Sequence, residues 1–121
     1  MKSYKDLDIY TISFDLFITS HMFTMKLPKY EMYELGSQIR RSADSVNSNI
    51  VEGYGRRAYK QDYLKFLTYS HASNLEVYNH LEKIAVLYPD LAEEAQTLGK
   101  KYDALGIKIN NFINYVTREW R

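Results

Sequence analysis

The chain has 121 residues, of which 45% are apolar, enough for one domain with one hydrophobic core and too apolar for a disordered chain. Its formal net charge is +1, so any case for an anionic partner rests on local clustering of charge. The absence of cysteine excludes disulfides, thiolate metal sites and thiol nucleophiles. No apolar run is long enough for a signal peptide or a membrane span, which predicts a cytoplasmic protein.

The first predicted helix covers about residues 4–25. Apolar residues recur along it at roughly helical spacing, which predicts that they form one face and point into the core. These residues are Leu7, Phe14, Phe17, Ile18 and Met22.

The second predicted helix covers residues 28–52. Pro28 suits its first turn, and Glu31 lies near its positive end, where a carboxylate is favourable. Apolar residues follow in steps of three or four, namely Met32, Leu35, Ile39, Ala43, Val46 and Ile50. Gly53 and Gly55 end the pattern, since glycine permits a left-handed helix end.

The third and fourth predicted helices cover about residues 59–87 and 90–120. The third carries the stripe Leu64, Leu67, Tyr78, Leu81 and Ala85. The fourth follows Pro89, with Asp90 as its expected N-cap, and carries the stripe Leu91, Ala95, Leu98, Tyr102, Leu105, Ile109, Phe112 and Val116. Short connections make neighbouring helices antiparallel, so we expect an all-α, up-down-up-down four-helix bundle, with residues 1–121 as a single domain.

A row of polar side chains accompanies these stripes on the second and third helices. Residues three or four apart share one helix face, and the polar residues at that spacing are Arg41, Ser45, Asn49 and Glu52 on one helix, and Ser73, Glu76 and His80 on the other. We expect a structural polar layer of Arg41, Ser45, Asn49, Glu52, Ser73 and Glu76. In it Glu76 accepts hydrogen bonds from Ser45 or Asn49. The alternative is a catalytic carboxylate pair, although no nucleophile or recognised motif accompanies it.

Residues 40–65 hold six basic side chains against three acidic ones, with tyrosines interleaved. This pattern is typical of a surface that contacts phosphates and stacks bases on tyrosine. The nucleic-acid-binding residues it predicts are Arg40, Arg56, Arg57, Lys60, Lys65, Tyr54 and Tyr59. The alternative is a solvated loop with salt bridges between subunits. Arg41 can instead form an ion pair with Glu52 or Glu76.

The three histidines match no metal or nuclease pattern. Bundle di-iron sites need Glu-x-x-His on two helices, whereas Glu76 and His80 are four apart and no second pair exists. No histidine has an arginine a few residues before it, as helical-bundle RNases of the HEPN type require. His71, at a core-spaced position, is expected to be an interior hydrogen-bonded residue. We therefore expect no metal, no cofactor and no enzymatic activity.

The region around residues 38–57 resembles the 23S rRNA intervening sequence protein family, which also includes the accessory variability determinants of diversity-generating retroelements. The matching runs are residues 4–7, 28–31, 38–43, 48–53, 63–67 and 72–76, together with Ser45. Asn47 replaces the usual proline, which predicts a straighter second helix. Asn74 replaces a usual apolar residue in the third helix.

This resemblance implies a bacterial-type antiparallel four-helix bundle that assembles as a homopentamer. Members of the retroelement class bind nucleic acid and a reverse transcriptase, so RNA, DNA or such a protein is the implied partner. No catalytic residue is known for the family. A ring would also repeat the basic cluster in every subunit. We therefore expect a non-enzymatic nucleic-acid-binding or ribonucleoprotein accessory protein. The alternative is a protein-interaction scaffold that self-assembles and binds a protein partner without nucleic acid.

Overall fold

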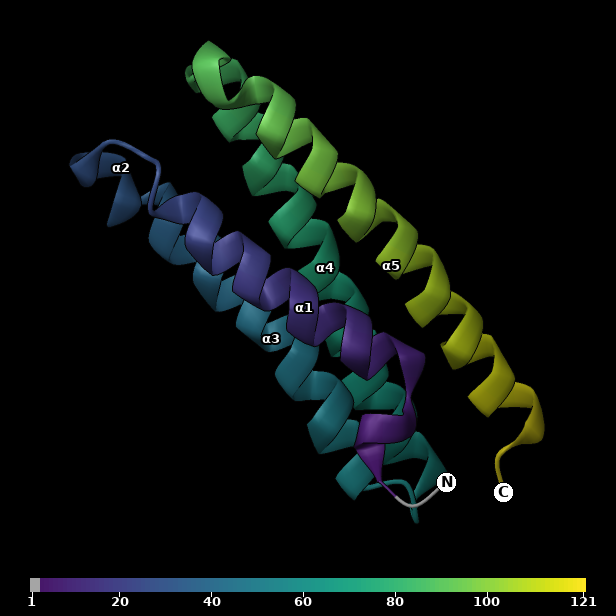
Figure 1. Cartoon of the computed structure of the whole chain (residues 1–121). Helices are drawn as coiled ribbons and strands as arrows, with labels where there is room; N and C mark the ends of the chain where they lie inside the picture. Colours follow the sequence, from purple (N-terminus) through teal and green to yellow (C-terminus); the bar gives the residue numbers. More distant parts are fainter. Residues whose placement is uncertain (1–2) are drawn as a thin grey trace.

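The computed structural model describes residues 3–121, and every regular element among them is helical, as predicted. The four long helices are α1 (Asp8–Thr24), α3 (Leu35–Gly55), α4 (Lys60–Leu87) and α5 (Ala92–Glu119). The short elements are the 3₁₀ turns η1 (Tyr4–Asp6) and η2 (Pro89–Leu91) and the single turn α2 (Lys29–Met32). The long helices lie along a common axis, and η1 and the C-terminal end of α5 lie at the same end of the bundle (Figure 1). This arrangement is compatible with the expected antiparallel bundle.

The second predicted helix is interrupted after its first turn. α2 ends before Tyr33, and α3 begins after Glu34, whose backbone angles of φ −104° and ψ −99° are not helical. Pro28 precedes the helix as its N-cap residue and does not form its first turn. The carboxylate of Glu31 accepts a 3.1 Å hydrogen bond from the backbone N–H of Leu35, so it caps α3 across the break. The spacing of apolar residues alone does not reveal an interruption as short as Tyr33 and Glu34.

Two other predicted helix ends also differ. α3 continues through Gly53 to Gly55, and neither glycine has a positive φ, so the predicted left-handed end is wrong. Gly53 is instead a contact position, where an added Cβ would lie 3.2 Å from the Cβ of Phe66 on α4. Asp90 lies within η2, and α5 starts after Leu91 without a side-chain cap.

Three of the four predicted apolar stripes supply the core. The buried apolar residues of α3 are Ile39, Ala43, Val46, Ile50 and Tyr54. Those of α4 are Tyr63, Leu67, Val77, Leu81 and Ile84, and those of α5 are Ala95, Leu98, Tyr102, Leu105, Ile109 and Val116. A fully buried large apolar side chain contributes roughly 1.5–3 kcal/mol, so these stripes are the main stabilising feature of the bundle.

α1 departs from its predicted orientation. Phe14, Ile18 and Met22, predicted to face the core, are 45%, 47% and 61% exposed. Of the same predicted stripe, Leu7 is buried and Phe17 is partly buried against the core. The face that is buried carries Ile9, Ser13, Leu16, Ser20, Phe23 and Thr24. The helix therefore has two candidate faces with three large apolar side chains each, and the face that also carries small hydroxyl residues packs against α3 and α5. Although its outer face is apolar, none of the helices in residues 3–121 combines the length and apolarity of a membrane span.

The buried serines of α1 are satisfied by partners from other helices. Ser20 Oγ and the hydroxyl of Tyr102 on α5 share a 2.6 Å hydrogen bond. Ser13 Oγ accepts a 3.1 Å hydrogen bond from the side-chain amide of Asn47, which lies within the uninterrupted α3. Such partners offset the cost of burying a hydroxyl, which is why this face of α1 is tolerated in the interior.

Candidate nucleic-acid interface

Most of the predicted basic and aromatic residues gather where α3 ends and α4 begins. The loop of residues 56–59 joins the two helices at the end of the bundle where η1 and the C-terminal end of α5 also lie (Figure 1). Arg56, Arg57 and Tyr59 are exposed on this loop. Lys60 and Lys65 follow on the first turns of α4, half-buried and exposed respectively. We call this group the basic end.

Arg57 is held by contacts that leave its charge unpaired. Its guanidinium carbon lies 4.0 Å from the ring centroid of Tyr54, and Nη1 donates a 2.9 Å hydrogen bond to the carbonyl of Tyr54. The indole N–H of Trp120 donates a 2.7 Å hydrogen bond to the backbone carbonyl of Arg57. The Trp120 ring packs edge-on against buried Tyr63, at 5.3 Å between centroids. Among residues 3–121 no carboxylate pairs with Arg57, so a fixed cation faces solvent.

Arg56 and Lys60 are engaged within the molecule. The guanidinium of Arg56 lies 3.1 Å from a carboxylate oxygen of Glu52 and 3.8 Å from one of Asp62. The ammonium of Lys60 donates a 2.8 Å hydrogen bond to the backbone carbonyl of Thr117, in the last turn of α5. Each would have to exchange an existing partner for a phosphate.

Lys65 and Tyr59 are more available to a ligand than Arg56 and Lys60. The ammonium of Lys65 lies 5.8 Å and 6.0 Å from the ring centroids of Phe66 and Tyr69, and it has no carboxylate partner in the described part of the chain. Tyr59 is 71% exposed, so its ring is open to stacking. Tyr54 is buried beneath Arg57 and supports that side chain.

The structure does not bring Arg40 together with the basic end. Arg40 lies sixteen residues before Arg56 on α3, or about 24 Å at the helical rise. Its Nη1 donates a 2.8 Å hydrogen bond to Thr24 Oγ1, and its Nη2 donates a 2.9 Å hydrogen bond to the carbonyl of Met32. The side chain is half-buried and ties the end of α1 and the short α2 to α3.

The residues of the predicted polar layer fall into separate groups. Ser45 Oγ and Ser73 Oγ are 2.8 Å apart, and the Asn49 amide donates to Ser45 Oγ at 2.9 Å. Glu76 accepts a 2.8 Å hydrogen bond from Ser42 Oγ, where Ser45 or Asn49 was expected as its donor. The Ser45–Ser73 and Ser42–Glu76 contacts link α3 to α4; Ser45 and Ser73 are half-buried, Ser42 is buried and Glu76 is exposed.

Arg41 and Glu52 lie outside that layer. Arg41 is exposed and donates a 3.1 Å hydrogen bond to Ser37 Oγ, and no carboxylate within residues 3–121 forms an ion pair with it. Glu52 pairs with Arg56 at the basic end. Ser42, which bonds Glu76, lies ten residues before Glu52, about 15 Å along α3. Glu76 therefore contacts the first half of α3, whereas Glu52 pairs with a residue beyond the end of α3.

The structure also holds polar contacts that the sequence analysis missed. The Asn74 amide donates a 2.8 Å hydrogen bond to the carbonyl of Tyr102, while its Oδ1 is buried without a partner among the described residues. The Tyr102 hydroxyl donates a 3.1 Å hydrogen bond to the carbonyl of Leu16, and burial raises its pKa. His80 is buried, whereas His71, expected to be interior, is half-buried. The sequence signal for the buried contact with Tyr102 was Asn74, a polar residue at an apolar position of the α4 stripe.

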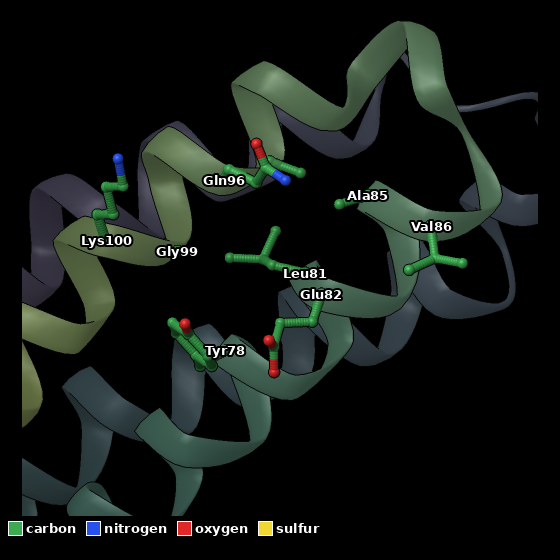
Figure 2. A pocket seen from close by; sticks show the side chains of 9 residues that line it. Tyr78, Leu81, Glu82, Ala85, Val86, Gln96, Gly99 and Lys100 are labelled. Carbon is green, nitrogen blue, oxygen red and sulfur yellow. The ribbon is translucent and has the colours of Figure 1, made fainter.

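A hollow between α4 and α5 offers no converging catalytic groups (Figure 2). Its lining includes the apolar side chains of Leu81, Ala85 and Val86. Glu82 and Lys100 are at its edges, and their side chains point away from each other (Figure 2). Elsewhere in residues 3–121, no three His, Asp or Glu side chains gather as potential metal ligands.

Comparison with protein families gives one match over most of this structure. The family model described as 23S rRNA-intervening sequence protein matches residues 5–111, which include α1, α3, α4 and the basic end. Among individually curated proteins, no relative matches the chain.

Proposed function

Because the chain belongs to the 23S rRNA-intervening sequence protein family, we propose that it acts as a non-enzymatic, RNA-associated accessory protein. Its helices form an antiparallel up-down-up-down bundle in a single domain. The protein works in the cytoplasm as a ring-shaped oligomer, for which the family resemblance implies five subunits. The basic end contacts nucleic acid.

The observation that supports this proposal is the paired exposure of Arg57 and Tyr59 on one anchored loop. Arg57 carries an unpaired charge, and Tyr59 offers an open ring within two residues of it. Together with Lys65 they supply two phosphate contacts and one stacking surface per subunit. Structured RNA presents unstacked bases in loops and bulges, which suit such a surface.

The remaining predicted residues have secondary roles in this proposal. Arg56 and Lys60 contribute when a phosphate replaces Glu52 or the Thr117 carbonyl. Tyr54 positions Arg57, while Arg40 acts in the fold at the other end of the bundle. Contacts to phosphates dominate, so base specificity is low. A ring repeats the modest charge of the basic end in each subunit and strengthens the field.

The test is binding of labelled structured RNA and of duplex DNA at ~50 and ~200 mM salt, with the oligomer mass measured on the same sample. Micromolar or tighter RNA binding that falls steeply with salt supports the proposal, and the slope counts the phosphate contacts. Absence of binding by an intact oligomer at low salt contradicts it.

A second candidate function is a protein-interaction scaffold that binds no nucleic acid. The exposed apolar side chains of α1 favour it, because such a face suits a protein partner. An oligomer that ignores RNA at low salt but retains a specific protein in a pull-down supports this alternative.

A further inference from the structure

The outer face of α1 is unusually apolar for a helix that faces water. The α1 ridge, as we call it, consists of Phe14, Ile18 and Met22 together with Met25, which directly follows the helix, and these side chains are 44–61% exposed. None of them is charged. The outer face of α3, by contrast, carries Gln38, Arg41, Asp44 and Ser48. A contiguous apolar face on one helix of a bundle marks an interaction surface.

A groove between α4 and α5 has apolar walls on the outside of the bundle. Leu75 and Ile107, 60% and 59% exposed, lie on its two sides, and we call it the α4–α5 groove. Gly106 leaves space there because it has no side chain, and buried Asn74 also lines the groove, with an Oδ1 that has no hydrogen-bond partner within residues 3–121. The space within it is about 510 Å³.

We propose that the α1 ridge of one copy packs into the α4–α5 groove of a second copy. Side chains at i, i+4 and i+8 on a helix form a ridge that fits between two neighbouring helices. Removing the exposed apolar surfaces of ridge and groove from water favours the contact. The ridge side chains carry no charge, and the ionisable groups among the lining residues of the groove are His71, Tyr78 and Asp103.

A second copy of the chain occupies the α4–α5 groove, because the α1 ridge and the groove are both exposed apolar surfaces and each would cover the other. Pairing of two α1 ridges would leave Leu75 and Ile107 exposed in every subunit. An RNA partner would need cations, which the ridge lacks. Ridge and groove are different surfaces, so a contact that is not returned within the same pair of copies is heterologous, and repeating it generates a ring or a filament. This inference rests on the proposed function, to which it supplies the oligomer interface.

The first test compares the solution mass of the native chain with that of Ile18→Lys. We expect the native chain to be an oligomer and Ile18→Lys to be a monomer of unchanged helicity and melting temperature, because Ile18 is half exposed in the protomer. Val86→Lys is the matched control, since Val86 is 80% exposed on α4 outside the groove, and it should keep the native mass. An Ile18→Lys variant of native mass overturns the proposal.

The second test uses the absence of cysteine. A chain carrying both Ile18→Cys and Ile107→Cys, treated with a flexible bismaleimide, should give a ladder of cross-linked species, while each single variant should not. Cross-linked dimers of Ile18→Cys alone would mean an α1–α1 contact and overturn the groove assignment.

RNA binding on the same samples separates the two proposals. A native oligomer that Ile18→Lys dissociates but that never binds RNA contradicts only the proposed function.

Discussion

The phenolic hydroxyl of Tyr88 donates a 2.8 Å hydrogen bond to the carboxylate of Glu31, although the two residues lie 57 positions apart. Glu31 is only 6% exposed, and its other oxygen accepts the backbone N–H of Leu35. The hydrogen bond to Glu31 raises the pKa of Tyr88, since it favours the protonated phenol. One carboxylate thus caps α3 and ties the break after α2 to the end of α4.

Replacing Glu31 with alanine should destabilise the bundle by about 1–3 kcal/mol, because it leaves the Leu35 N–H uncapped and the Tyr88 hydroxyl without its acceptor. Urea unfolding measures the change. The neighbouring exposed carboxylate offers the control, and Glu34→Ala should stay within about 0.5 kcal/mol. In a double-mutant cycle, Glu31→Ala and Tyr88→Phe should be non-additive, and full additivity would refute the coupling.

Adjacent arginines on α3 should behave differently. Arg40→Ala should cost about 1–3 kcal/mol of unfolding free energy, because it removes two hydrogen bonds that tie Thr24 and the Met32 carbonyl to α3. Arg41→Ala removes one exposed contact to Ser37 and should change stability by less than about 0.5 kcal/mol. Thermal melts of both variants check this, and equal melting temperatures would contradict a structural role for Arg40.

Joint replacement of Arg57 and Lys65 with alanine should weaken RNA binding. Loss of two phosphate contacts should flatten the slope of log affinity against log salt by about 1.4–1.8, with the melting temperature almost unchanged. Arg56→Ala should have a smaller effect, because Arg56 already pairs with Glu52 and Asp62. Filter binding across a salt series gives the slopes, and an unaltered slope in the double variant would exclude these two residues from the interface.

Two glycines of α5 should respond oppositely to alanine. A Cβ at Gly99 would lie at an ordinary contact distance of 3.6 Å from Tyr78, so Gly99→Ala should stabilise by up to about 1 kcal/mol through helix propensity. A Cβ at Gly106 would lie 2.9 Å from the buried amide of Asn74, which bonds the Tyr102 carbonyl. Gly106→Ala should therefore lower the melting temperature. Calorimetry measures both melting temperatures, and a shift of the same sign in the two variants would contradict this account.

Stability should fall at alkaline pH. Burial raises the pKa of Tyr63 from 10.0 to about 12, and burial also raises the pKa of Tyr102. A raised pKa in the folded state contributes stability below pH 10.0 that is lost as pH rises toward 12. Melting temperatures across this window should decline, and less steeply in Tyr63→Phe. A decline that is identical in the variant would show that Tyr63 does not titrate in this way.

The sequence by itself determined the four long helices and most of the core, but not the break between α2 and α3. On α5 the predicted stripe includes Leu98, Leu105 and Ile109, all buried, because steps of three and four mark a single apolar face that can bury in only one way. The grouping of Arg57, Tyr59 and Lys65 near one helix junction also followed from their proximity in the chain. Such features depend on local spacing, which a sequence displays directly.

Only the tertiary structure decided which face of α1 is buried and which cations are free. Periodicity locates the apolar side chains of Ile18 and Met22 but does not show that Ser20 has a partner in Tyr102, contributed from a distant helix. Likewise, the sequence alone indicates that Arg40 is a surface charge. Only the tertiary structure shows that its guanidinium donates hydrogen bonds to Thr24 and to the Met32 carbonyl. Burial and hydrogen bonding depend on contacts between segments far apart in the chain, so they appear only when the helices pack.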